Sequence, residues 1–439
     1  MNLGHARSID LFKFGHSVLA GGVSSPGRAF SEVQTPTLVL ERGHGCRVVD
    51  VDGNTYVDFI GGLGPLILGH SPEPVRRALA EQAERGTVFG APNALEYRLA
   101  ERILASTPWL DRLRFTCSGT EAVMTAVRLA KGCTDRSKIV KFNGGYHGHS
   151  DVLLARGTKR LMRAAGGVHN GLDDFVLDNT LIVEYNDAAG AAALFADHGR
   201  DIAAVVVEPC ATNMGLVKPL PGFLARLRQL CDDAGALLIF DEVVSGFRFR
   251  HGSLSIELGI EPDFVTFGKI IGGGTPIGAY GGRAEHLTLL QTAGGVFQGG
   301  TFAGNPLSMA AGLATLEETA REGFYERLER LGALVEDVLV GGFRRTGLPY
   351  GVQRKGSLFS FILAEGLDRL TNFADVQRQD TALFAGFHHD MSERGFLLPP
   401  TIEEPVFISA AHTESDLRAF AEAAVDALAA RRAVPSSTA

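Results

Sequence analysis

The chain has 439 residues, of which 45% are hydrophobic and 21% are charged, and this ordinary globular composition can bury a large core. Its 42 basic and 50 acidic residues give a formal net charge of −8, and no long basic run is present, which argues against nucleic acid as a partner. The five cysteines lack C-x-x-C spacing, and their odd number argues against a disulfide framework or a cysteine-rich zinc site.

The N-terminal segment, residues 1–22, mixes polar and apolar side chains and lacks the continuous apolar core of a signal peptide. No stretch reaches the roughly 20 apolar residues that are needed to cross a bilayer. We therefore expect a cytoplasmic protein that has no membrane partner.

The middle of the chain alternates short apolar runs with helix-period segments, which is typical of β-α units that feed a mainly parallel sheet. The predicted strands are residues 112–117, 138–142, 203–207, 236–240 and 264–267. Between the third and fourth strands, one apolar helix face is predicted, ended by Gly235. It carries Phe223, Leu227, Leu230 and Cys231.

The last part of the chain, from about Leu313 onward, has more charged helical segments. It ends in a predicted helix that begins at the capping pair Thr413 and Asp416. We predict three parts: an N-terminal segment, a large ligand-binding domain and a C-terminal small domain with which the first packs. Their residues are 1–60, 61–312 and 313–439, respectively.

The segment CSGTEA, residues 117–122, lies where a predicted strand ends and a helix begins. Gly119 lets the backbone approach a ligand, while Ser118 and Thr120 add hydroxyl groups to the free N–H groups of the helix start. This arrangement suits a phosphate. Ser and Thr also cap helices for purely structural reasons, so this motif alone leaves both interpretations open.

Asp241 and Lys269 each follow a predicted buried strand. An Asp at a strand end can pair with a protonated pyridine nitrogen and keep the ring an electron sink, although Asp there is also a common turn former. A lysine between an apolar strand and a glycine run can form an imine with an aldehyde cofactor and later move protons. Most lysines are simply solvated, but this context favours a functional one.

The segment FNGGYHGH, residues 142–149, is a glycine-rich loop in which Tyr146 could stack on a flat heterocycle. His147 and His149 invite a metal interpretation. No carboxylate or cysteine at ligand spacing supports it, so we expect no metal.

Together these segments resemble the class III aminotransferases, and within them the glutamate-1-semialdehyde 2,1-aminomutases. The other segments that carry the resemblance are GGVSSPGRAF (21–30), GTVFGAPNALE (86–96), EP (208–209), NMG (213–215) and GTFAGNP (300–306). The resemblance spans nearly the whole chain. It implies an α/β protein of PLP fold type I, aminotransferase-like, with a large domain around a mainly parallel sheet. It also implies a smaller α+β domain formed by the N- and C-terminal segments.

The resemblance implies pyridoxal 5′-phosphate (PLP) as the cofactor, with pyridoxamine 5′-phosphate as its amino form. It makes Lys269 the Schiff-base lysine, Asp241 the partner of the pyridine nitrogen and Tyr146 the residue over the ring. It also implies that Val243 packs under the ring and that Asn213 lies near the ring hydroxyl. The other cofactor-binding residues that it implies are Ser118, Gly119 and Thr120 on the phosphate, with His147, Glu208 and Thr301.

Thr301 matches the residue that reaches the phosphate of the neighbouring subunit, which implies a homodimer with shared active sites. Arg28 matches the position associated with the substrate carboxylate, and Glu404 matches an active-site acid. Both are also interpretable as surface residues. Two segments depart from the aminomutase pattern: Leu63 replaces a tryptophan of the pocket wall, and residues 155–170 differ from the gating loop.

These departures favour transfer between a small amino donor and an acceptor, with a carboxylate-bearing amino acid, keto acid or aldehyde as substrate. Glutamate-1-semialdehyde 2,1-aminomutase itself, or a PLP racemase or decarboxylase, is the alternative, since these enzymes share the core residues. A PLP-sensing regulator would need an appended DNA-binding module. The roughly 110 residues before the phosphate motif leave no room for one, because much of that segment matches the enzyme family.

Overall fold

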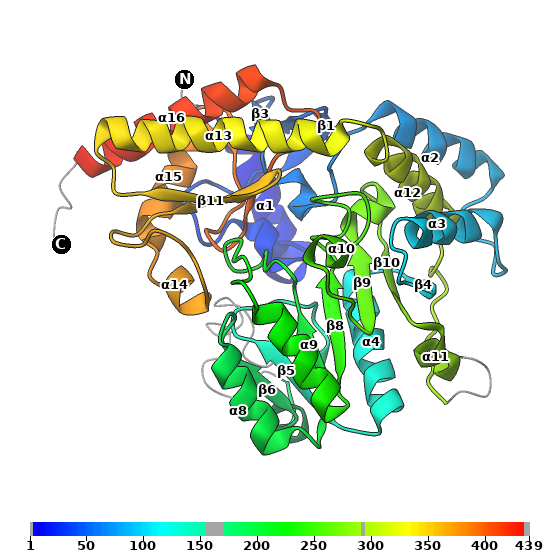
Figure 1. Ribbon diagram of the computed structural model, residues 1–439. Helices are drawn as coiled ribbons and strands as arrows, with labels where there is room; N and C mark the ends of the chain where they lie inside the picture. Colours follow the sequence, from blue (N-terminus) through cyan, green and yellow to red (C-terminus); the bar gives the residue numbers. More distant parts are fainter. Residues whose placement is uncertain (1–2, 155–170, 291–294, 434–439) are drawn as a thin grey trace. The chain divides into compact units, whose positions relative to one another are not determined.

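The structure is a computed structural model that describes residues 3–154, 171–290 and 295–433 (Figure 1). The chain divides into two compact units. The small unit comprises Met1–Pro72, Gly323–Leu370 and Asp375–Ala439, and the large unit comprises Glu73–Glu322 and Thr371–Ala374. In the described ranges, no helix is both long and apolar enough to span a membrane.

The described part of the large unit is built on a seven-stranded sheet with the order β4-β10-β9-β8-β7-β5-β6. The strands are β4 (Arg112–Thr116), β5 (Lys138–Phe142), β6 (Thr180–Val183), β7 (Ile202–Val207), β8 (Leu237–Glu242), β9 (Phe264–Gly268) and β10 (Gly278–Gly282). The pairs from β6 to β9 are parallel, and β10 runs antiparallel to β4 and β9. The predicted mainly parallel sheet and its five predicted strands are confirmed, with strand ends that differ by at most two residues.

Helices of the large unit pack on this sheet and on one another. They are α2 (Glu73–Arg85), α3 (Ala94–Ala105), α4 (Gly119–Thr134), α5 (Asp151–Leu154), α7 (Asp174–Asp178), α8 (Ala188–His198), α9 (Phe223–Ala234), α10 (Ser255–Leu258), α11 (Ala284–Leu287) and α12 (Pro306–Thr319), with the 3-10 turns η4 (Lys269–Gly272) and η5 (Thr288–Leu290). The helix predicted between the third and fourth strands is α9, which buries its apolar face against β7 and β8 and ends at Gly235, whose φ is +65°. Helix α4 packs on five strands, β4 and β7 to β10, so its N-terminus is fixed at the sheet edge.

The described part of the small unit contains two sheets, β1-β2-β3-β13 and β11-β12-β14. Their strand pairs are antiparallel except for β3 with β13, which is parallel. The strands are β1 (Leu40–His44), β2 (Arg47–Asp50), β3 (Thr55–Asp58), β11 (Gly351–Lys355), β12 (Leu358–Ile362), β13 (Phe396–Leu397) and β14 (Val406–Phe407). The helices are α1 (Ala6–Val18), α13 (Phe324–Thr346), α15 (Thr381–Glu393) and α16 (Glu414–Ala433), with η1 (Ala20–Gly22), η2 (Pro26–Ala29) and η3 (Gly61–Leu63), while α14 (Phe373–Gln377) begins at the last residues of the large unit.

The predicted C-terminal helix is confirmed as α16, which lies side by side with α13 (Figure 1). Its buried face includes Leu417, Phe420 and Val425. The predicted capping pair is also confirmed: the backbone N–H of Asp416 donates to Oγ1 of Thr413 at 3.1 Å, and the backbone N–H of Thr413 donates to Oδ2 of Asp416 at 3.2 Å.

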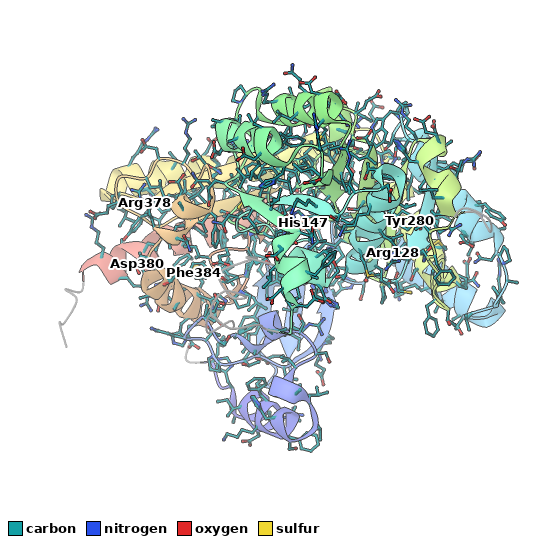
Figure 2. The ribbon with its side chains drawn as sticks, turned by 90° about the horizontal axis from the view of Figure 1, so that it is seen from below. Arg128, His147, Tyr280, Arg378, Asp380 and Phe384 are labelled. Carbon is teal, nitrogen blue, oxygen red and sulfur yellow. The ribbon has the colours of Figure 1, made fainter. Side chains whose placement is uncertain are left out.

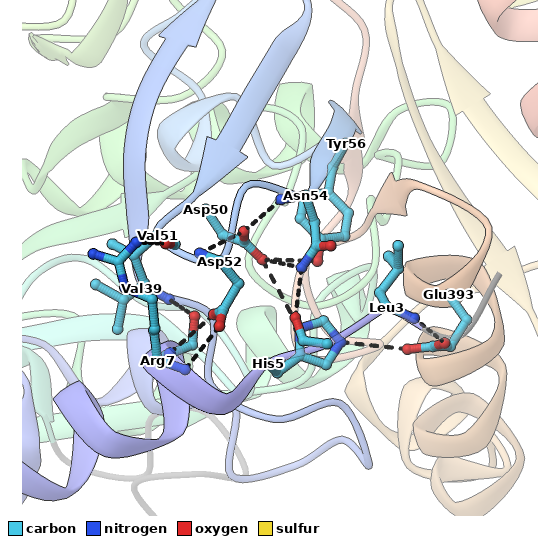
Figure 3. Close-up of polar contacts among 12 residues, drawn as sticks. Leu3, His5, Arg7, Val39, Asp50, Val51, Asp52, Asn54, Tyr56 and Glu393 are labelled. Atoms are coloured by element: carbon cyan, nitrogen blue, oxygen red, sulfur yellow. Dashed lines mark hydrogen bonds and ion pairs between the residues drawn. The ribbon is translucent and has the colours of Figure 1, made fainter.

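The first helix is fixed to the rest of the small unit by side chains from distant segments (Figure 3). Oδ1 of Asp52 accepts a hydrogen bond from the backbone N–H of Arg7 at 2.7 Å, and Oδ2 accepts one from that of Ser8 at 2.9 Å. Burial raises the pKa of Asp52, but hydrogen bonds from Ser8 and Arg7 outweigh it, so the pKa is lowered. Nε2 of His5 lies 3.3 Å from Oε1 of Glu393. Asp52 thus caps α1 across the sequence.

Candidate active site

The carboxyl ends of three neighbouring strands gather acidic and basic side chains. Glu208 directly follows β7, Asp241 is the last residue but one of β8, and Lys269 directly follows β9. These strands are parallel and adjacent in the sheet, so their ends lie at one edge, where open parallel sheets bind ligands. The fold therefore places three residues expected from the sequence at a shared edge.

Asp241 is a buried carboxylate with its own set of donors. Its Oδ2 lies 2.8 Å from Nδ1 of His147, and its Oδ1 accepts hydrogen bonds from the backbone N–H of Val243 at 3.0 Å and from Oγ1 of Thr266 at 3.1 Å. Both Asp241 and His147 are buried (Figure 2 labels His147). Three donors from three segments hold the carboxylate in one orientation.

A second buried acid, Glu208, lies in the same electrostatic environment. Its Oε2 accepts from the backbone N–H of Thr212 at 2.9 Å and from Oγ1 of that residue at 2.6 Å, and its Oε1 accepts from Nδ2 of Asn213 at 3.0 Å. Burial raises the pKa of Glu208, the charge of Asp241 raises it further, and His147 opposes this shift. The site thus contains two carboxyl groups whose negative charges repel each other. The imidazole of His147 interacts with both, through a hydrogen bond to Asp241 and through its electrostatic effect on Glu208.

The glycine-rich loop after β5 carries the aromatic residue that the sequence pointed to. Tyr146 is 38% exposed, whereas the next residue, His147, is only 3% exposed. Nδ2 of Asn213 donates to the backbone oxygen of Tyr146 at 3.4 Å. The same amide therefore contacts Glu208 and this loop, which joins three of the expected residues in one network.

Lys269 has an unusual backbone conformation. Its φ is +48°, in the left-handed region that residues other than glycine rarely adopt. It begins the turn η4 immediately after the buried strand β9, and it is partly buried. Such strain persists only where the surroundings hold the residue in place, and it concentrates at functional sites.

Two glycines make room for Val243 beside this lysine. A Cβ atom at Gly119 would lie 2.8 Å from Cγ1 of Val243, and one at Gly268 would lie 3.1 Å from it. A side chain at Gly119 would therefore displace Val243. Val243 thus packs against the start of α4 and the end of β9, next to Asp241, whose carboxylate accepts its N–H group.

The start of α4 forms a capping box. Oγ of Ser118 accepts from the backbone N–H of Glu121 at 3.2 Å, and Oε2 of Glu121 accepts from the backbone N–H of Cys117 at 2.7 Å. The hydroxyl of Ser118 thus serves the helix. The N–H groups of Gly119 and Thr120, in the first helical turn, have no intrahelical partner by geometry and can bind an anion with the helix dipole.

Sequence reasoning missed three residues that support these groups: Thr266, Thr212 and Glu121. Thr266 lies opposite Asp241 in the pairing of β8 with β9. Working out the register of the predicted strands could have indicated this contact. Glu121 follows Ser118 by three residues, and this spacing is the sequence signature of a capping box.

Glu242, the residue after Asp241, lies on the opposite face of β8. Glu242 is fully buried, and its carboxylate accepts hydrogen bonds from Ser253 Oγ and from the backbone N–H of Leu254. Burial raises the pKa of Glu242 to about 7, and these hydrogen bonds oppose the shift. Because side chains alternate along a strand, one acid of the pair faces the site and the other holds the following loop.

Three expected substrate residues belong to the small unit. Arg28 lies in the 3-10 turn η2, Leu63 ends η3 with a φ of +64°, and Glu404 lies in the turn before β14. The loop 155–170 lies outside the described residues. Among the residues that are described, no cluster of three His, Cys, Asp or Glu side chains is placed to hold a metal ion.

Thr301 lies in an exposed segment of the large unit. This segment and residues 88–96 line one surface pocket. Nδ2 of Asn305 donates to the backbone oxygen of Thr87 at 2.9 Å, and Nδ2 of Asn93 donates to that of Gly304 at 3.3 Å. Two segments that the sequence singled out are thus joined side by side.

Known proteins resemble this chain over nearly its whole length. The family model Aminotransferase class-III matches residues 29–404. A glutamate-1-semialdehyde 2,1-aminomutase of Syntrophomonas wolfei is 46% identical over 94% of this chain and 95% of its own length. A glutamate-1-semialdehyde 2,1-aminomutase 2 of Staphylococcus haemolyticus is 41% identical over 94% and 96%, respectively.

Solved structures have the same fold. An omega-transaminase from Sphaerobacter thermophilus superposes with a TM-score of 0.87 at 32% identity, covering 95% of this chain and 96% of its own. A transaminase with PLP bound superposes with a TM-score of 0.85 at 29% identity, covering 97% of both chains. The expected PLP fold type I is confirmed.

Proposed function

Because the chain belongs to the class III aminotransferases, we propose that it uses PLP to transfer an amino group between small molecules, with Lys269 as the covalent attachment site. The observation that carries the proposal is the buried Asp241, oriented by three donors and adjacent in the sheet to the strand that ends at Lys269. A buried carboxylate needs a cationic partner to offset its desolvation, and a protonated pyridine nitrogen would supply one.

The residues present fit this cofactor. The start of α4 offers N–H groups for a phosphate, and Gly119 keeps the space beside Val243 open. Tyr146 provides an aromatic ring that is partly exposed, as stacking requires. When bound, PLP supplies an electron sink for the charge that develops on the substrate carbon.

Different side chains of the chain then have different roles in the reaction. Asp241 would pair with the ring nitrogen, and His147 and Thr266 hold its carboxylate in place. Lys269 would hold and return a proton at the reacting carbon. Asn213 orients the ring hydroxyl, and its bond to Glu208 fixes the amide. Electron withdrawal and proton transfer are thus assigned to different side chains.

The substrate carries a carboxylate in this proposal. Arg28 is the candidate partner, since a guanidinium binds a carboxylate through two parallel hydrogen bonds. Leu63 offers an aliphatic wall at a position with strained backbone, which fits a residue that shapes a pocket. Glu404 is a candidate for contact with the substrate amine.

We also infer a homodimer with shared active sites, located in the cytoplasm. Thr301 would contact the phosphate bound by a second copy of this chain. The support is a set of large apolar side chains exposed around that segment, which is typical of an interface: Val88, Phe89, Tyr97, Phe297 and Phe302. None of the five cysteines, all of which lie in the described residues, forms a disulfide, as expected in a reducing compartment.

A second candidate is glutamate-1-semialdehyde 2,1-aminomutase activity, and the names of the curated relatives favour it. Both candidates use the same core residues. They differ in whether the cofactor's amino group returns to the same substrate molecule.

A donor and acceptor screen separates the candidates. The holoenzyme is mixed with single amino donors, and the cofactor absorbance is followed as it changes from the aldehyde to the amine form. A transaminase gives this change with a donor alone and reverses it with a keto acid or aldehyde. Efficient isomerisation of glutamate-1-semialdehyde without any second substrate would favour the aminomutase, and no spectral change with any amine would reject both.

A further inference from the structure

Residues 296–301 have no regular secondary structure, yet fixed groups hold them. The backbone N–H of Val296 donates to the oxygen of Leu289 at 3.0 Å. Farther along, Phe297 is 81% exposed, and Gly299, Gly300 and Thr301 are exposed as well. An exposed segment without regular structure keeps one conformation only if its contacts hold it.

Two side chains from regular elements supply these contacts. NH1 of Arg128, on α4, donates to the backbone oxygen of Phe297 at 3.0 Å. The hydroxyl of Tyr280, on β10, donates to Oε1 of Gln298 at 3.1 Å. Arg128 and Tyr280 are labelled in Figure 2. Consecutive residues are thus held, one by its backbone and the next by its side chain.

The hydroxyl of Tyr280 has a fixed position. Its ring is fully buried in the hydrophobic core between α4 and the sheet. Burial raises the pKa of Tyr280 to about 12, although Arg114 and Arg128 oppose the shift. The hydroxyl therefore keeps its proton and donates throughout the physiological range.

The far end of the segment is also anchored, by the Asn305 and Asn93 contacts described above. Between the anchors, Gly299, Gly300 and Thr301 are exposed, and Thr301 lines the surface pocket described above. A polar group held rigidly at an exposed position between anchors is suited to bind something outside its own chain.

We propose that Arg128 and Tyr280 are positioning residues, which hold Thr301 where it binds the cofactor phosphate of a second copy of this chain. The inference rests on the proposed function, because it requires a PLP-binding homodimer. In this proposal, the N-terminus of α4 binds the phosphate of its own subunit. Through Arg128, the same helix positions Thr301 for contact with the phosphate of the second copy. Each subunit then completes the site of its partner through a few hydrogen bonds of fixed geometry.

The test measures the affinity of the dimeric protein for PLP and for pyridoxal, which lacks the phosphate. Tyr280→Phe removes one donor, and Gln298→Leu removes its acceptor from the exposed side, where folding is least at risk. Arg128→Met removes the other donor. Each variant should weaken PLP binding by roughly threefold to tenfold, the range of a single hydrogen bond, and leave pyridoxal binding unchanged. Tyr350→Phe and Lys131→Met serve as matched controls.

A double-mutant cycle with Thr301→Val gives the sharper result. If the positioning residues act through Thr301, then Tyr280→Phe adds no further loss in the Thr301→Val background. Equal loss for PLP and pyridoxal, no loss, or full loss in both backgrounds would overturn the inference. If Thr301→Val itself leaves PLP affinity unchanged, the contact between subunits in the proposed function fails first, and light scattering shows whether the dimer fails with it.

Discussion

Nδ1 of His147 lies 2.8 Å from Oδ2 of Asp241, and both side chains are buried. The two residues come from different strand ends, 94 positions apart in the chain. A buried hydrogen bond of this kind fixes the orientation of the carboxylate. In the proposed mechanism, Asp241 would act on the cofactor and His147 would act through Asp241.

Removing the His147 side chain is therefore predicted to lower kcat/KM. His147→Ala leaves the buried carboxylate with one donor fewer, and the loss of a hydrogen bond to a charged group should lower kcat/KM by roughly tenfold to hundredfold. Steady-state kinetics measure this effect. His149→Ala, which changes an exposed histidine in the same loop, is the control, and an equal loss in both variants would contradict the assigned role.

Arg28→Ala should affect one substrate class only. If the guanidinium binds the substrate carboxylate, the variant loses about 1.5–3 kcal/mol of binding for carboxylate-bearing amines, which is roughly a tenfold to hundredfold loss in kcat/KM. Amines without a carboxylate should react as before, and PLP affinity should not change. An equal loss for both amine classes would remove Arg28 from this role.

Gly119→Ala should weaken cofactor binding by crowding Val243, because the new Cβ atom would lie 2.8 Å from Cγ1 of Val243. Overpacking of this kind costs about 1–3 kcal/mol. Val243→Ala in the same chain should restore part of the PLP affinity. PLP titration of the single and double variants tests the contact, and a double variant that is weaker than both single variants would contradict it.

Lys141 gives a prediction for the dependence of stability on pH. Its side chain is fully buried, Nζ donates to the backbone oxygen of Leu153 at 2.6 Å, and burial lowers its pKa to about 8. The unfolded chain, with a lysine pKa of about 10.4, then binds more protons between these values, so the free energy of unfolding rises with pH in that window.

Lys141→Met lacks this group and should lack its contribution to the rise. Between about pH 8 and about pH 10.4, the free energy of unfolding of the wild type should therefore rise by about 3 kcal/mol relative to that of the variant. Urea unfolding of both proteins over that range measures the change. Parallel stability curves would show that the amine is not desolvated.

Buried apolar strands were predictable because they alternate with helical segments, and each of the five was found. The strand β10 was not predicted, because its sequence, GAYGG, is rich in glycine, which is rare in strands. Packing explains the glycines: a Cβ at Gly278 would lie 2.1 Å from the backbone oxygen of Ser118, and one at Gly282 would lie 2.3 Å from that of Asp263. Close approach of neighbouring strands selects glycine here, against strand propensity.

For the candidate site, the sequence indicated the residues at strand ends but not their partners. Asp241 and Lys269 follow apolar runs that can be read directly. The contacts of Asp241 with His147 and Thr266 depend on the order and register of the strands, which a single sequence does not specify. Ser118 was predicted for a phosphate, and the capping box with Glu121 shows that its hydroxyl also has a structural role.

Borohydride reduction tests whether the cofactor attaches to Lys269. The protein is incubated with PLP, reduced, digested and mapped by mass spectrometry. We expect one phosphopyridoxyl adduct, on the peptide that contains Lys269, and none on that peptide in Lys269→Ala. An adduct on a different lysine, or no adduct after incubation with PLP, would contradict the account.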